Sequence, residues 1–60
     1  MCESTVYDTD GNKIMDDVLS IKINGNIIDL ADILNEQKQL KGNIVEIDLD
    51  NHRIYVDLEN

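Results

Sequence analysis

The strongest constraint on the fold is a strict alternation of apolar and polar residues near the end of the chain, at positions 45–50 and 54–59. A period of two residues predicts β-strands. A two-residue loop at Asn51 and His52 would join these strands, because both residue types tolerate a positive φ, and it would set Asp50 opposite Arg53. The loop would place three apolar pairs on one face: Val45 with Leu58, Ile47 with Val56, and Leu49 with Ile54.

A second hairpin is predicted around Asn24 and Gly25, because this dipeptide is the strongest short hairpin signal. A loop at Asn24-Gly25 pairs Ile21 with Ile28, whereas a loop at Gly25-Asn26 pairs Ile23 with Ile28. The sequence leaves both registers open. Either register predicts the same buried face: Leu19, Ile21, Ile23, Ile28 and Leu30.

A third hairpin is predicted to turn at Asp10 and Gly11. This turn would place three pairs of residues opposite one another: Val6 with Met15, Tyr7 with Ile14, and Asp8 with Lys13. Turn signals therefore recur along the chain at the spacing expected of a small sandwich or barrel.

Residues 30–40 fit two interpretations. Leu30, Ile33, Leu34 and Gln37 follow helical spacing, and Asp29 or Asp32 could cap such a helix. The same segment could form two short strands around a turn at Asn35-Glu36. The chain holds nine Ile and four Val, which favour strands, so we expect the strand form.

These patterns predict an all-β protein: a single domain over residues 1–60, built from consecutive hairpins as a small antiparallel β-barrel or sandwich. A domain of this size buries only about 60% of the surface that its unfolded chain exposes. The chain has no Trp or Phe and only two Tyr, so its core is expected to be thin. We therefore expect a homodimer, because a second copy could cover apolar surface that one copy leaves exposed.

The composition also constrains location and partners. Apolar runs are far shorter than the roughly 20 residues of a membrane span, the acidic amino terminus does not resemble a signal peptide, and one cysteine suits a reducing compartment, so a cytoplasmic protein is expected. Thirteen acidic against five basic residues give a net charge of −8, which disfavours nucleic acid and favours cations. We find no glycine-rich phosphate loop, no CxxC motif and no second histidine, and we do not expect an enzyme.

The amino terminus is the candidate site. With Met1 retained, its amine, the Cys2 amide nitrogen and the Cys2 thiolate can close two fused five-membered chelate rings on one metal ion. With Met1 removed, the Cys2 amine and thiolate close one ring, and the Glu3 amide nitrogen closes another. Nitrogen and thiolate donors in a flat arrangement suit Ni(II) or Cu(II).

Each of these residues also has a plain structural interpretation. Cys2 could be buried as a small hydrophobic residue, and His52 could serve only as a turn residue rather than as an additional imidazole ligand. The acidic pairs Asp16-Asp17 and Asp48/Asp50 could do acid/base work or hold a hard cation, but in so short and acidic a chain a solvated face explains them better.

Three stretches of the sequence are similar to the CooT family of small nickel-binding proteins: MCESTVY at residues 1–7, the segment 16–32, and KGNIVEIDLDNHRI at residues 41–54. The resemblance covers nearly the whole chain. It implies a small β-rich homodimer, with Cys2 as a nickel ligand near its counterpart at the dimer interface. It also implies an accessory role in nickel delivery to an enzyme such as carbon monoxide dehydrogenase.

The main alternative comes from a different class of function. The chain could be a small β interaction module without a metal, whose acidic face binds a basic protein. RNA binding is a weaker form of this alternative, because the few basic residues would have to gather on one face.

Overall fold

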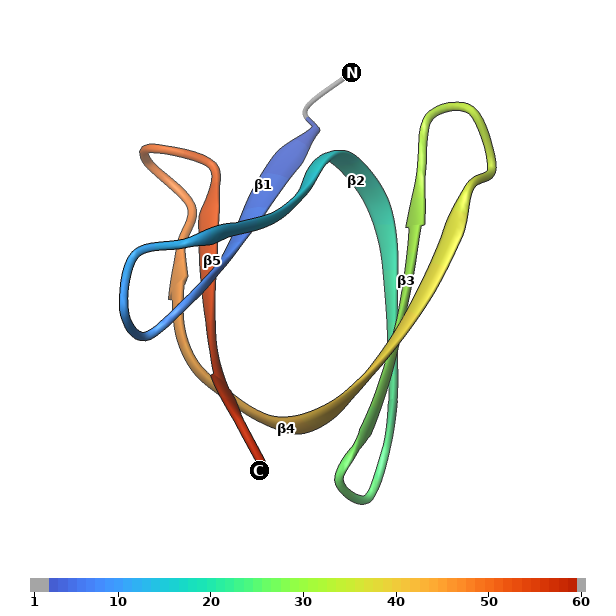
Figure 1. The fold of residues 1–60 in the computed structure, drawn as a ribbon. Helices are drawn as coiled ribbons and strands as arrows, with labels where there is room; N and C mark the ends of the chain where they lie inside the picture. Colours follow the sequence, from blue (N-terminus) through green and yellow to red (C-terminus); the bar gives the residue numbers. More distant parts are fainter. Residues whose placement is uncertain (1–2, 60) are drawn as a thin grey trace.

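The computed structural model describes residues 3–59, which form five strands and no helix (Figure 1). The strands are β1 (Ser4–Asp8), β2 (Lys13–Asn24), β3 (Ile27–Asp32), β4 (Gln37–Asp48) and β5 (Arg53–Leu58). The all-β fold class is confirmed. Residues 30–40 form the end of β3, a turn and the start of β4, as the strand interpretation predicts.

The strands close into a barrel in chain order, β1-β2-β3-β4-β5 (Figure 1). Each strand runs antiparallel to the next, and β5 returns to lie parallel to β1. The parallel closure follows from the number of strands, because in a meander of five the first and the last run in the same direction. Strands β2 and β4 have 12 residues each, and each bends so that its two halves pair with different neighbours.

Aspartates end three of the strands and organise the turns that follow. Asp8, Asp32 and Asp48 each close a strand with a carboxylate that accepts main-chain N–H bonds. The donors are main-chain N–H groups two to four residues further on, with donor–acceptor distances of 2.9–3.0 Å. They belong to Asp10 and Asn12 for Asp8, to Leu34 and Glu36 for Asp32, and to Asn51 for Asp48. Such side-chain turns compete with tight two-residue loops, and here they set the connection lengths.

The predicted register of the last hairpin is wrong. Asp48 pairs with Arg53, and Ile47 pairs with Ile54 rather than with Val56. The reason is the turn at Asp48, which takes four residues, 49–52, where a two-residue loop was predicted. A bulge at Val45 shifts the register once more, so Ile44 lies opposite Val56.

These shifts change which residues of β4 face the core. Val45 and Ile47 are each 56% exposed and Leu49 is 79% exposed, although all three were predicted to be buried. Ile44 packs against the core instead, and Gly42 is buried. Alternation alone could not predict this, because a single bulge reverses the inward and outward parity beyond it.

The β2–β3 hairpin adopts the second of its two registers, with Ile23 opposite Ile28 and a loop at Gly25-Asn26. Gly25 has a φ of 60°, the value required at the first loop position of a type II′ turn. The predicted buried face is only partly correct. Ile28 and Leu30 are buried and Ile21 packs against the core, but Leu19 lies at a register shift and is 45% exposed, and Ile23 is 60% exposed.

In the first hairpin the predicted Val6–Met15 pair is confirmed, but the pairing beyond it is shifted by one residue. Tyr7 lies opposite Lys13 rather than Ile14, because the register shifts between Val6 and Tyr7. Lys13 is therefore not the partner of Asp8, whose carboxylate is occupied by the turn.

The core consists only of aliphatic side chains and one methionine. Every strand contributes to it except β4, which supplies partly buried residues: Leu40 and Ile44. The buried members are Val6, Met15, Val18, Ile28, Leu30, Ile54 and Val56. The prediction of a thin core is therefore confirmed, and both aromatic rings lie outside it.

Candidate functional site

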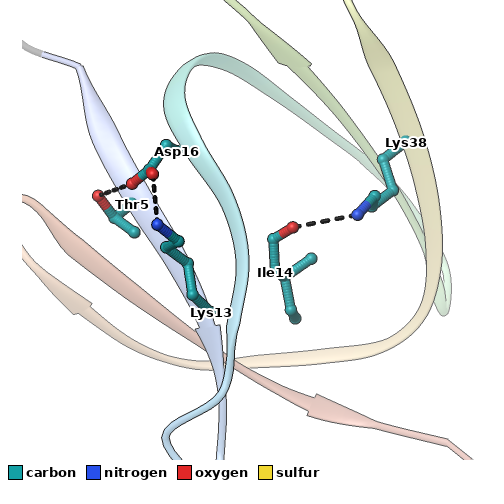
Figure 2. Close-up of polar contacts among 5 residues, drawn as sticks. All are labelled: Thr5, Lys13, Ile14, Asp16 and Lys38. Atoms are coloured by element: carbon teal, nitrogen blue, oxygen red, sulfur yellow. Dashed lines mark hydrogen bonds and ion pairs between the residues drawn. The ribbon is translucent and has the colours of Figure 1, made fainter.

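The chain enters the barrel at β1, between the last turn and the bend of β2. The Thr5 main-chain N–H donates a 2.9 Å hydrogen bond to the carbonyl oxygen of His52. The Thr5 hydroxyl donates to the Asp16 carboxylate at 3.2 Å (Figure 2). The start of β1 is thus held on both sides, which fixes the place from which the amino-terminal residues leave the barrel.

The predicted ligands lie partly outside the described residues. Met1 and Cys2 are outside them, so the structure does not test the chelating terminus. Glu3 is the first described residue and is half-buried just before β1.

His52 occupies the turn position that its residue type allows. It has a φ of 56° and an exposed side chain, and it lies in the four-residue turn between β4 and β5. Its carbonyl contact with Thr5 also places the β4–β5 turn beside the chain three residues after Cys2.

One member of each acidic pair, Asp16 and Asp48, is engaged in structural contacts. Asp16 accepts from the Thr5 hydroxyl and forms a 2.6 Å ion pair with Lys13 (Figure 2). The ion pair lowers the pKa of Asp16 and raises the pKa of Lys13. Asp48 accepts from both the main-chain and the side-chain N–H groups of Asn51, and the side-chain bond is the main reason why its pKa is lowered. Over residues 3–59, no three His, Cys, Asp or Glu side chains gather as a metal site.

The two most exposed large apolar side chains lie in two turns at the same end of the barrel, on opposite sides of it (Figure 1). The turn at 33–36 and the turn at 49–52 lie at the end where the chain enters β1 (Figure 1). Leu34 is 82% exposed in the first turn and Leu49 is 79% exposed in the second. The Ile33 N–H also donates to the carbonyl oxygen of Asp17 at the β2 bend, at 3.0 Å. Sequence reasoning missed this surface, because it assigned Leu49 to a buried strand face.

The two tyrosines form a separate feature on the outside of the barrel. Tyr7 of β1 and Tyr55 of β5 are partners in the parallel register, and their rings stack with centroids 5.7 Å apart and planes 25° apart. Both side chains are half-exposed. The sequence identified these residues only as the two aromatic rings, because their pairing depends on the parallel closure of the barrel.

A shallow polar hollow of about 640 Å³ lies across β2, β3 and β4, lined in part by Lys22, Asp29 and Gln39. Asp29 accepts a 2.9 Å hydrogen bond from the Gln39 amide. Neither Glu3 nor His52 lines this hollow. In the described part of the chain there is also no helix long and apolar enough to cross a membrane.

Comparison with known proteins identifies relatives across nearly the full length. A family model described as "CO dehydrogenase accessory protein CooT" matches residues 1–57. An uncharacterized protein of Methanothermobacter thermautotrophicus is 43% identical over 60 residues, which are 100% of this chain and 94% of the relative. An uncharacterized protein of Archaeoglobus fulgidus is 36% identical over 45 residues, which are 75% of this chain and 100% of the relative.

Proposed function

Because this chain belongs to the CooT family of CO dehydrogenase accessory proteins, we propose that it is a nickel-binding accessory protein that carries Ni(II) at its amino terminus. The family consists of accessory proteins rather than catalytic enzymes. The match from residue 1 to residue 57 carries the proposal, because it includes the Met-Cys start together with the barrel. The recipient of the metal is a CO dehydrogenase in the same cytoplasm.

The proposed ligands are the Cys2 thiolate and the main-chain nitrogens beside it. If Met1 is retained, these are its amine and the Cys2 amide nitrogen; if it is removed, they are the Cys2 amine and the Glu3 amide nitrogen. Among the described residues, pairing within the sheet begins at Ser4, two positions after Cys2 in the sequence. A thiolate combined with nitrogen donors suits Ni(II), and the net charge of −8 attracts a dication.

A homodimer belongs to the same proposal. Leu34 and Leu49 expose apolar surface at the end of the barrel from which the amino terminus leaves. A second copy packed on this end would cover that surface and bring the two amino termini close together. Two Cys2 thiolates could then share one nickel ion, or each could hold its own.

Native mass spectrometry with and without Ni(II) tests the proposal, because one spectrum shows Met1 processing, subunit number and metal count. We expect a dimer that binds one Ni(II) per dimer or per subunit, with sulfur-to-nickel charge-transfer absorption. Binding should strengthen as pH rises, because the amine and the thiol must lose protons. Cys2→Ser should abolish both signals.

A matched control moves the thiol without removing it. The double variant Cys2→Ser/Thr9→Cys keeps one cysteine, but its thiol lies in the exposed turn after β1, too far along the chain to close chelate rings fused to the terminal amine. We expect this variant to bind no better than Cys2→Ser. Full nickel binding by Cys2→Ser would refute the proposed ligand, and restored binding in the double variant would refute the chelate geometry.

A further inference from the structure

The two tyrosines stand out because a chain with a thin core places both of its rings on the surface. The buried core holds no aromatic residue, and Tyr7 and Tyr55 stack on the outer side of β1 and β5. Aromatic side chains supply much of the binding energy at protein interfaces. Placing both rings outside the core therefore provides a recognition surface rather than core stability.

Two carboxylates border this stack. Glu46 of β4 is the register partner of Tyr55, and Asp57 lies two residues beyond Tyr55 on β5, so all three side chains are on the outer side. Both acidic side chains are exposed, and neither has a hydrogen bond or ion pair to another residue in the described range 3–59. We call Tyr7, Tyr55, Glu46 and Asp57 the tyrosine face.

Lys13 and Arg53 lie near the tyrosine face, and within residues 3–59 neither forms an ion pair with Glu46 or Asp57. Lys13, the register partner of Tyr7, forms its ion pair with Asp16 (Figure 2). Arg53 lies opposite Asp48 in the register, and its charge helps to lower the pKa of that carboxyl. The stacked rings are therefore flanked by two carboxylates that form no ion pair within residues 3–59.

The combination of ring and carboxylate selects a particular kind of cation. A guanidinium group is planar, stacks on an aromatic ring and binds a carboxylate with two parallel hydrogen bonds, whereas an ammonium group is a compact, strongly hydrated charge. The polar hollow on β2, β3 and β4 does not include the tyrosine face, which lies on strands and suits an extended segment rather than an enclosed small molecule. The net charge of −8 repels nucleic acid.

We propose that the tyrosine face is a docking surface for an arginine-containing segment of a partner protein. One arginine stacks on the Tyr7–Tyr55 pair and donates to Glu46 or Asp57. None of its four residues is a proposed nickel ligand, so docking requires neither Cys2 nor a metal. An accessory protein needs such a contact to select its client before any metal passes.

Intrinsic fluorescence reports directly on this surface, because Tyr7 and Tyr55 are the two tyrosines of a chain without tryptophan. The probe is the peptide acetyl-GRGRG-amide, compared with acetyl-GKGKG-amide, titrated at low salt with a chelator present. We expect the arginine peptide to change the tyrosine emission and to bind about fivefold more tightly than the lysine peptide, since stacking on an exposed ring contributes roughly 1 kcal/mol.

Variants separate stacking from general charge attraction. Tyr55→Leu should weaken binding of the arginine peptide about fivefold, followed through amide shifts, while Tyr55→Phe keeps the ring and the affinity. Glu46→Gln/Asp57→Asn should weaken binding more than Asp29→Asn/Glu36→Gln, which changes the net charge equally on β3 and in the turn after it, where neither β1 nor β5 is a neighbouring strand. Thermal melting checks the fold of each variant, and Tyr7→Leu replaces Tyr55→Leu should that variant unfold.

Three outcomes would overturn the inference. The first is equal affinity for the two peptides. The second is equal weakening by the two charge variants with no effect of losing a ring. The third is binding of a twelve-residue oligouridine to the tyrosine face. None of them concerns nickel, so this inference and the proposed function fail independently.

Discussion

Replacing Gly42 by alanine tests the point at which β4 changes partners. Lys41 is the last residue of β4 to pair with β3, and Gly42 is the first to pair with β5, opposite Leu58. The Gly42 N–H also donates a 2.9 Å hydrogen bond to the carbonyl oxygen of Asn26. The backbones approach closely here, so a Cβ at Gly42 would lie 2.2 Å from the carbonyl oxygen of Asp57.

The expected cost is large because the contact is with backbone atoms, which cannot rotate away as a side chain can. The added Cβ would also meet the Asp57 carbonyl carbon and the Leu58 Cα, each at 3.0 Å. Overpacking a well-packed site typically costs about 1–3 kcal/mol, and a backbone clash belongs at the upper end, about 3 kcal/mol. A 60-residue domain at about 0.05–0.15 kcal/mol per residue has a total stability of only roughly 3–9 kcal/mol. Gly42→Ala should therefore remove a third or more of it.

Urea unfolding at one fixed protein concentration measures the effect, followed by circular dichroism and by tyrosine fluorescence. Gly11→Ala is the matched control, because Gly11 has a φ of 87° but no atom within 4 Å of the added Cβ. The control should cost roughly 1–2 kcal/mol from backbone strain alone. Equal urea midpoints for the two variants would refute the reasoning that the close approach to Asp57 requires glycine.

Three further predictions concern pH, self-association and the core. The hydrogen bonds from Asn51 lower the pKa of Asp48 below its ordinary value of 3.8. The Asp48 carboxylate therefore contributes its full stabilisation above pH 3.8, and this contribution is lost as the pH falls through the lower pKa of the folded protein. A carboxyl NMR titration with a midpoint at or above 3.8 would contradict this. Leu49→Ser should weaken the proposed dimer in light scattering, whereas Ile23→Ser, at the opposite end of the barrel, should not. Ile28→Ala should lower the free energy of unfolding in urea by about 2–5 kcal/mol, because Ile28 is 0% exposed. An equal loss of unfolding free energy in Ile47→Ala, at a residue that is 56% exposed, would contradict the observed core.

The sequence predicted the class of structure but not the pairing of residues within it. The alternation at 45–50 and 54–59 correctly indicated strands, and Gly11, Gly25 and His52 correctly indicated turns. The registers of the first and last hairpins were wrong because the aspartate turns and the bulge at Val45 each change the pairing by one or two residues. These shifts depend on contacts that a period of two residues does not contain.

The candidate sites divide in the same way. Cys2 could be proposed from its position alone, since chelate rings at a chain terminus are a matter of covalent geometry. The tyrosine face could not, because Tyr7 and Tyr55 are 48 positions apart in the sequence and meet only in the parallel pairing of β1 with β5. The exposure of Leu49 likewise depends on where the last turn is closed.

Composition and local pattern thus determined an acidic, helix-free hairpin protein with a thin core, because strand propensity, turn chemistry and net charge are local or additive properties of the residues. Tertiary structure decided how the ring closes, which parity of β4 points inward and which distant side chains share a face. Those features depend on the balance among bulges, carboxylate-capped turns and the close backbone approach at Gly42, and that balance is settled only when all five strands are in place.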